Sequence, residues 1–123
     1  MFKRGDVILA PCRGDDGYEL RPHWMVVLHV DPEDGAIYAV FTTSTKEGLS
    51  GGQYSFTEAE RVLAGFQKPS RFVPERVWKF APGVHHLIQR PATAGRVSSL
   101  TLDRIASAVY KRRPAFQEYK LAQ

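Results

Sequence analysis

A chain of 123 residues can form one domain with a modest core, and 17 Lys and Arg against 13 Asp and Glu give it a formal charge of +4. Its single cysteine, Cys12, excludes an internal disulfide, and it contains no apolar run of about eighteen residues and no signal-peptide pattern. We therefore expect one cytoplasmic domain over residues 1–123, whose basic balance suits a polyanionic partner without requiring one.

The first half of the chain predicts three strands. Phe2 to Ala10 (FKRGDVILA) reads as a strand, and the Gly- and Asp-rich residues 11–20 predict a long polar loop. Two runs rich in β-branched and aromatic residues, His23 to Val30 and Ala36 to Thr42, flank the turn-forming sequence DPEDG and predict a hairpin. Because neither run alternates with polar residues, we expect this hairpin at the centre of the sheet.

The middle of the chain mixes turns with one short helix. Residues 43–52 (TSTKEGLSGG) are rich in turn-forming residues, and residues 53–56 could add a short strand. Thr57 and Glu60 stand at the spacing of a capping box, which predicts a helix of one or two turns that ends at Gly65.

Two further strands are predicted after this helix. Arg71 to Phe80 reads as a strand in which Pro74 requires an edge position or a bulge. Val84 to Arg90 (VHHLIQR) predicts a short strand, so the adjacent His85 and His86 would point to opposite faces and could not share a metal ion.

The chain closes with a predicted amphipathic helix. Apolar residues recur at helical spacing after a possible cap at Ser98 or Ser99, and they are Leu102, Ile105, Ala106 and Val109. The order of elements predicts a mainly β protein, a small and strongly curled antiparallel barrel with a C-terminal helix packed on it.

Polar residues gather at one end of the predicted hairpin. Arg21 and Pro22 precede its first strand, and Thr42, Thr43 and Ser44 follow its second strand. Antiparallel pairing brings these positions to the same edge of the sheet, which is the strongest functional indication in the sequence.

Several segments, in their order and spacing, resemble the PemK/MazF family of toxin endoribonucleases. They are KRGDVILA, RPHWMVVL, YAVFTTS, KPSRFVPERVWKF and GRVSSLTLDRIASAV. The resemblance covers the chain from its N-terminus to the final helix. It implies an SH3-like antiparallel barrel, a homodimer, a cognate antitoxin protein as partner, and cleavage of single-stranded RNA without a metal ion or other cofactor.

The resemblance also implies roles for individual residues. In such a reaction the ribose 2′-OH attacks the adjacent phosphorus, which requires a base, an acid and a cation for the added negative charge. Arg21 would supply the cation, Thr42 a hydroxyl, and Glu75 the base by alignment, with His23 a second candidate base close to Arg21 in sequence. The expected RNA-binding residues are His23, Thr43, Ser44, Lys46, Arg71, Arg76 and Lys79.

Other interpretations remain open at this point. Trp78 stands where the family has an arginine, and Pro74 is unusual beside Glu75. These departures favour a barrel that has lost catalysis and acts as an RNA- or protein-binding, inhibitory module. A weaker alternative is a structural adaptor that uses the barrel only to dimerise.

Overall fold

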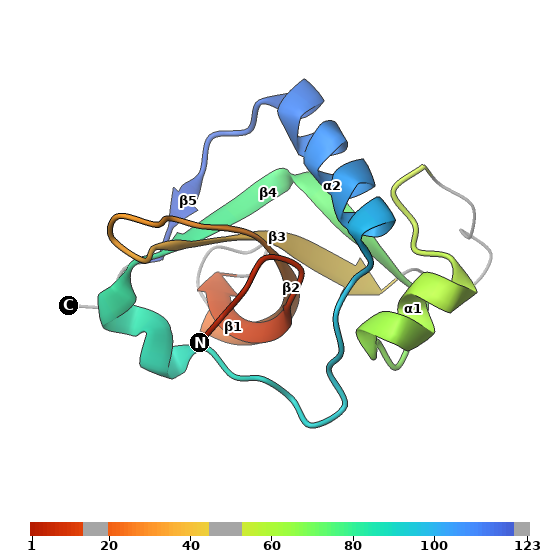
Figure 1. The fold of residues 1–123 in the computed structure, drawn as a ribbon, viewed down its shortest axis with the longest axis horizontal. Helices are drawn as coiled ribbons and strands as arrows, with labels where there is room; N and C mark the ends of the chain where they lie inside the picture. The colour runs from red at the N-terminus through yellow and green to blue at the C-terminus, as the bar shows by residue number, and fades with distance from the viewer. Residues whose placement is uncertain (14–19, 45–52, 120–123) are drawn as a thin grey trace.

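The computed structural model of this chain describes residues 1–13, 20–44 and 53–119. In chain order the elements are β1 (Val7–Arg13), β2 (Leu20–Val30), β3 (Ile37–Ser44), α1 (Glu58–Ala64), β4 (Ser70–Phe80), the 3-10 helix η1 (Pro82–Leu87), α2 (Ser99–Arg112) and β5 (Gln117–Glu118). The strands form one sheet in the order β1-β2-β3-β4-β5, which curls into a half-barrel with α2 lying across β4 (Figure 1). The prediction of a mainly β fold with a C-terminal helix is confirmed.

The predicted central hairpin is β2 and β3. These strands pair antiparallel, and β2 also pairs antiparallel with β1 while β3 pairs with β4. The turn between them closes where the Asp31 amide donates to the Ala36 carbonyl at 2.8 Å, and Gly35 adopts a positive φ of 79°. A glycine reaches that left-handed region without the steric cost that other residues incur there.

The sheet is buried on both faces, which explains why the apolar residues of the hairpin strands do not alternate with polar ones. Met25 and Val27 belong to one core cluster, together with Ile88 from the segment after η1. Val26, between them, belongs to the second cluster, with Ile105 of α2. Successive side chains of a strand point to opposite faces, so both sets of positions have to be apolar.

β4 contains the bulge predicted from Pro74. In the pairing of β3 with β4, Val40 faces Val77 whereas the next residue, Phe41, faces Val73. Residues 74–76 are therefore extra on β4, and a bulge is one of the few places in a sheet that accommodates a proline.

Both helices begin and end where the sequence indicates. Thr57 and Glu60 form the predicted capping box, and Gly65 ends α1 with a positive φ of 82°. Ser98, rather than Ser99, caps α2 by accepting from the Thr101 amide at 3.2 Å. None of the helices in the described part of the chain is long and apolar enough to cross a membrane.

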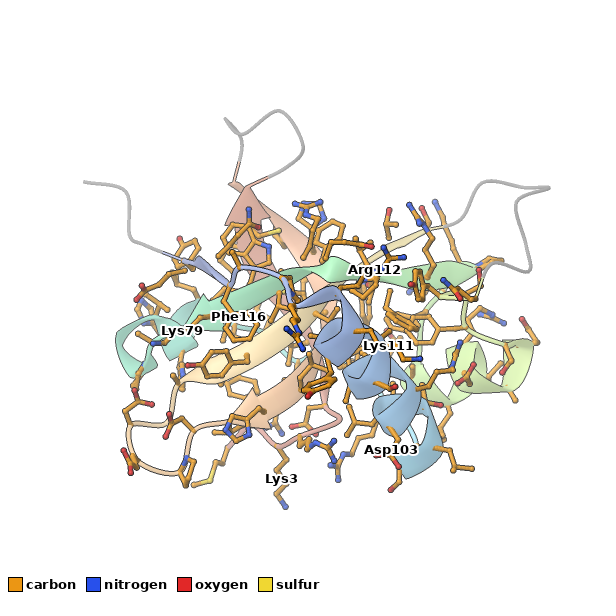
Figure 2. All side chains as sticks on the ribbon, turned by 90° about the horizontal axis from the view of Figure 1, so that it is seen from above. Lys3, Lys79, Asp103, Lys111, Arg112 and Phe116 are labelled. Atoms are coloured by element: carbon orange, nitrogen blue, oxygen red, sulfur yellow. The ribbon has the colours of Figure 1, made fainter. Side chains whose placement is uncertain are left out.

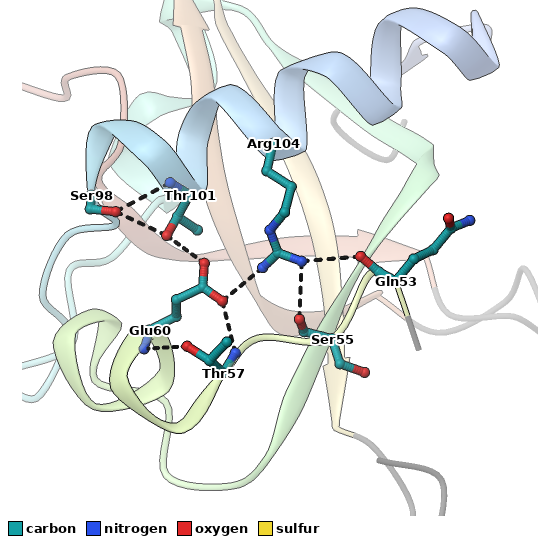
Figure 3. A network of polar contacts seen from close by, with 7 residues as sticks. All are labelled: Gln53, Ser55, Thr57, Glu60, Ser98, Thr101 and Arg104. Carbon is teal, nitrogen blue, oxygen red and sulfur yellow. Dashed lines mark hydrogen bonds and ion pairs between the residues drawn. The ribbon is translucent and has the colours of Figure 1, made fainter. Parts of the chain in front are cut away.

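A polar cluster ties the two helices to the chain segment before α1 (Figure 3). The Glu60 carboxylate accepts from the Thr57 amide at 2.8 Å, from the Thr101 hydroxyl at 2.5 Å and from Arg104 at 2.7 Å. Arg104 also donates to the carbonyl oxygens of Gln53 and Ser55, at 3.0 and 3.2 Å. These contacts fix the segment that runs beside the start of β4.

Three local predictions are wrong. The strand expected at Val84 to Arg90 is mostly the helix η1, because Pro82 occupies its first turn and Val84 is buried in that conformation. His85 and His86 are therefore neighbours on a helical turn and do not point to opposite faces of a strand. The first strand begins at Val7 and includes residues 11–13, expected in the loop, since an edge strand tolerates Pro11. Residues 53–56 form only a single bridge, between Ser55 and Arg71.

Candidate functional site: a cationic groove at the rim of the sheet

A groove with a volume of about 650 Å³ opens where β2 and β4 begin and β3 ends. Its lining comes from residues 22–24, residues 41–44, residues 66–68, and Ser70, Arg71, Val73 and Arg76. We call this the rim groove. It forms because antiparallel pairing places the last residues of β3 beside the first residues of its neighbours, as in the pair Ser44 and Ser70.

The structure brings together most of the residues expected at this edge. Pro22 and His23 line the groove, and so do Thr42, Thr43 and Ser44. The prediction placed Pro22 before the first strand of the hairpin and the hydroxyl residues after its second, but both strands are longer: Pro22 lies within β2, and the hydroxyl residues are the last three of β3. Arg21 lies in β2 directly before Pro22, opposite Cys12 of β1, and its side chain is not among those described. Lys46 lies outside the described residues.

The charge of the described groove lining is positive. Lys68, Arg71 and Arg76 contribute cations, and no Asp or Glu stands among the described lining residues. Arg71 is exposed, whereas Arg76 is half-buried with its guanidinium carbon 3.9 Å from the centre of the Phe41 ring. The ring of His23 also contacts Phe41, with ring centres 4.9 Å apart. This surface suits an anionic ligand.

Two of the groove hydroxyls are buried and donate their protons to the protein itself. Thr42 donates to the Trp24 carbonyl at 2.6 Å, which joins β2 to β3 beyond their last paired residues. Ser70 donates to the Lys68 carbonyl at 2.8 Å. Their oxygens retain lone pairs, so toward a ligand they act as acceptors while these bonds are kept. Thr43 and Ser44 are more exposed.

Two predicted site residues do not line the groove. Glu75 lies in the bulge beside Arg76, but its exposed carboxylate pairs with Arg112 of α2 at 3.5 Å. Lys79 lies farther along β4, where its ammonium is 5.8 Å from the centre of the Tyr38 ring. Figure 2 shows Lys79 near Phe116, on the side of the sheet toward the hairpin turn, and Arg112 at the end of α2.

Some groove residues were missed in the sequence. Phe66, Gln67, Lys68 and Ser70 line the groove but are not among the site residues that the sequence predicted. They could have been found from the antiparallel pairing of β3 with β4. This pairing places the residues just before β4 beside the hydroxyl residues at the end of β3. Phe66 packs edge-to-face against Trp24, with ring centres 5.9 Å apart, and these rings form the apolar wall of the groove.

Cations beside hydroxyl oxygens and aromatic side chains are the features that bind phosphates and stack on unpaired bases. A metal ion would need a different set: no group of three His, Cys, Asp or Glu side chains gathers anywhere in the described residues. No family model and no curated protein matches this chain.

Proposed function

We propose that this protein is an endoribonuclease that cleaves single-stranded RNA in the rim groove without a metal ion, as the toxin of a toxin–antitoxin pair. The observation that carries the proposal is the charge of the groove. Three cations, Lys68, Arg71 and Arg76, lie in one concave surface with hydroxyl and aromatic side chains, and no carboxylate accompanies them among the described lining residues. Such a surface complements a flexible chain of phosphates and bases.

In the proposed reaction the ribose 2′-oxygen bonds to phosphorus while its proton passes to a base, and the bond to the 5′-oxygen breaks as that oxygen takes a proton from water. Arg21, next to the groove-lining Pro22, would stabilise the charge of the pentavalent intermediate. His23 is the better-placed base, because it lines the groove whereas Glu75 pairs with Arg112 outside it. Histidine is also the side-chain type whose charge changes near neutral pH.

The architecture supports the part of the proposal that concerns the type of barrel. A curled half-barrel closed by a C-terminal helix is compatible with the SH3-like barrel of the PemK/MazF type that the sequence resembles. The resemblance extends to a homodimer and to an antitoxin as partner, and a sedimentation coefficient of a dimer at micromolar concentration is the expected result for the free protein.

A second candidate function is a binding or inhibitory module without catalysis. It is favoured by the position of Glu75, which leaves the described groove lining without a carboxylate, and by Trp78, which is buried in the core and away from the groove. This module would bind RNA or a protein in the same groove but leave RNA intact.

Cleavage of a labelled single-stranded RNA separates the two functions. We expect fragments with 5′-OH and 2′,3′-cyclic phosphate ends, in the presence of EDTA as in its absence. Arg21→Lys should bind RNA but cut it at least about a hundredfold more slowly, because the charge remains while the planar fork is lost. His23→Gln should lose cleavage and Glu75→Gln should retain it. Wild-type protein that binds RNA between about pH 5 and 9 without cutting it would leave the binding module as the function.

A further inference from the structure

The bulge of β4 determines which side chain reaches the rim groove. Between Val73 and Val77, which face neighbouring residues of β3, the strand inserts Pro74, Glu75 and Arg76. Arg76 thereby lies against Phe41 and lines the groove, whereas Glu75 pairs with α2. Bulges re-aim side chains in this way, and they are over-represented beside active sites.

The contact between Arg76 and Phe41 orients the guanidinium. Phe41 is 6% exposed and part of the core, so its ring is a rigid surface, and the Arg76 guanidinium carbon lies over it at 3.9 Å from its centre. The attraction between a cation and the face of a ring restrains the guanidinium, whose N–H donors form a rigid planar fork. Those donors match the oxygens of a phosphate.

No ring in the described part of the chain lies under the second β4 arginine of the groove. Arg71 is exposed, and it pairs through its backbone with Thr43 and Ser55. A long exposed side chain can meet a phosphate but is not held in one geometry, whereas Arg76 is half-buried with its guanidinium carbon over the Phe41 ring. Orientation matters most for a group that must meet the charge developing in a transition state.

We propose that Phe41 is a positioning residue that holds Arg76 on the scissile phosphate, and that Arg76 is a catalytic cation. This inference rests on the proposed ribonuclease function. As the 2′-oxygen bonds to phosphorus and the bond to the 5′-oxygen breaks, negative charge grows on the non-bridging oxygens, and the Arg76 N–H groups bond to them. Arg76 exchanges no proton: the 2′-OH proton goes to the base, and the leaving 5′-oxygen takes a proton from water.

The arginine is tested by comparing saturating cleavage rates with RNA affinities. Arg76→Ala should lower the saturating rate about a hundredfold or more while affinity falls only a few-fold, and Arg76→Lys should recover little of that rate. Arg71→Ala, the matched variant on the same strand, should lose mainly affinity. Guanidinium ion at about 10–50 mM should partly restore cleavage to Arg76→Ala and not to Arg71→Ala.

The role of Phe41 is tested by changing its ring electrons. Replacing Phe41 with pentafluorophenylalanine nearly preserves the shape of the side chain, so the melting temperature should change little. The replacement reverses the partial charge on the face of the ring, so the saturating rate should fall about threefold to tenfold. Phe41→Tyr, which keeps the electron-rich face of the ring, should lower the rate less than the fluorinated residue does. In Arg76→Ala the fluorinated residue should have no further effect, because the side chain that it positions is absent.

The outcomes distinguish this inference from the function on which it rests. Wild-type protein that never cuts RNA overturns both. Wild-type protein that cuts RNA, with Arg76→Ala equally active or without rescue by guanidinium, overturns the inference alone. A fluorinated Phe41 with an unchanged rate removes the positioning role of Phe41 and leaves that of Arg76.

Discussion

Thr42 shows how a residue expected to serve a ligand can instead hold the site together. Its hydroxyl donates to the Trp24 carbonyl at 2.6 Å, and its side chain is almost completely buried, at 5% exposure. The bond joins β2 to β3 between two residues that line the rim groove. In this conformation the Thr42 oxygen can accept a hydrogen bond from RNA, but its hydroxyl proton is already donated to the Trp24 carbonyl.

The valine and serine variants of Thr42 separate these roles. Thr42→Val keeps the shape but leaves the part-buried Trp24 carbonyl without this donor, so the free energy of unfolding should fall by about 1–3 kcal/mol. Thr42→Ser keeps the hydroxyl and should lose less. Chemical denaturation of the two variants measures the difference, and equal stability of Thr42→Val and the wild type would show that the hydrogen bond contributes nothing.

At the scale of elements, the cluster around Glu60 joins α1, α2 and the segment before α1. Burial alone would raise the pKa of Glu60, but hydrogen bonds from Thr101, the Thr57 amide and Arg104 outweigh it, and the pKa lies below its ordinary value of 4.5. Folding therefore favours the ionised carboxylate. The resulting stabilisation is present above about pH 4.5 and is lost as pH falls through the lowered pKa of the folded protein.

Glu60→Gln tests this coupling. It replaces the charged acceptor of Thr101 and Arg104 in a half-buried cluster with a neutral amide that can still accept from the Thr57 amide, so it should cost about 1–3 kcal/mol near neutral pH. The difference from the wild type should shrink below pH 4.5, where the wild-type carboxyl also loses its charge. Glu58→Gln, on the same helix, is the control: its pair with Arg61 is exposed and screened by solvent, and its melting temperature should barely change.

The sequence predicted those elements whose signals are local. Thr57 and Glu60 form a capping box through their own backbone contacts, and Pro74 excludes regular pairing wherever the strand lies. Segment 84–90 was misread because its apolar residues suit a strand or a short helix equally, and burial of Val84 in the assembled fold decides between them. The groove was half predictable: Thr42 and Pro22 follow from the hairpin, whereas Phe66 and Lys68 depend on how α1 packs.

At the scale of the whole molecule, cationic side chains lie on several faces, but the rim groove concentrates them on a concave surface. Arg71 and Arg76 line that groove, whereas Lys79 stacks near Tyr38 toward the hairpin turn (Figure 2). Removing any one of them changes the net charge of +4 by the same amount. Differences between the three variants therefore report on position and not on total charge.

The salt dependence of RNA binding shows which of these cations neutralise RNA phosphates. For single strands, the slope of log affinity against log salt is about −0.7 per phosphate neutralised. Arg71→Ala and Arg76→Ala should each reduce its magnitude by about 0.7, and the double variant by about twice that. Lys79→Ala should leave the slope unchanged, because its ammonium does not line the groove. Fluorescence anisotropy of a labelled single-stranded RNA over about 50–300 mM KCl measures the slopes of the wild type and the four variants. If Lys79→Ala reduces the magnitude of the slope as much as Arg71→Ala does, RNA responds to the total charge of the protein, and the rim groove is not its binding site.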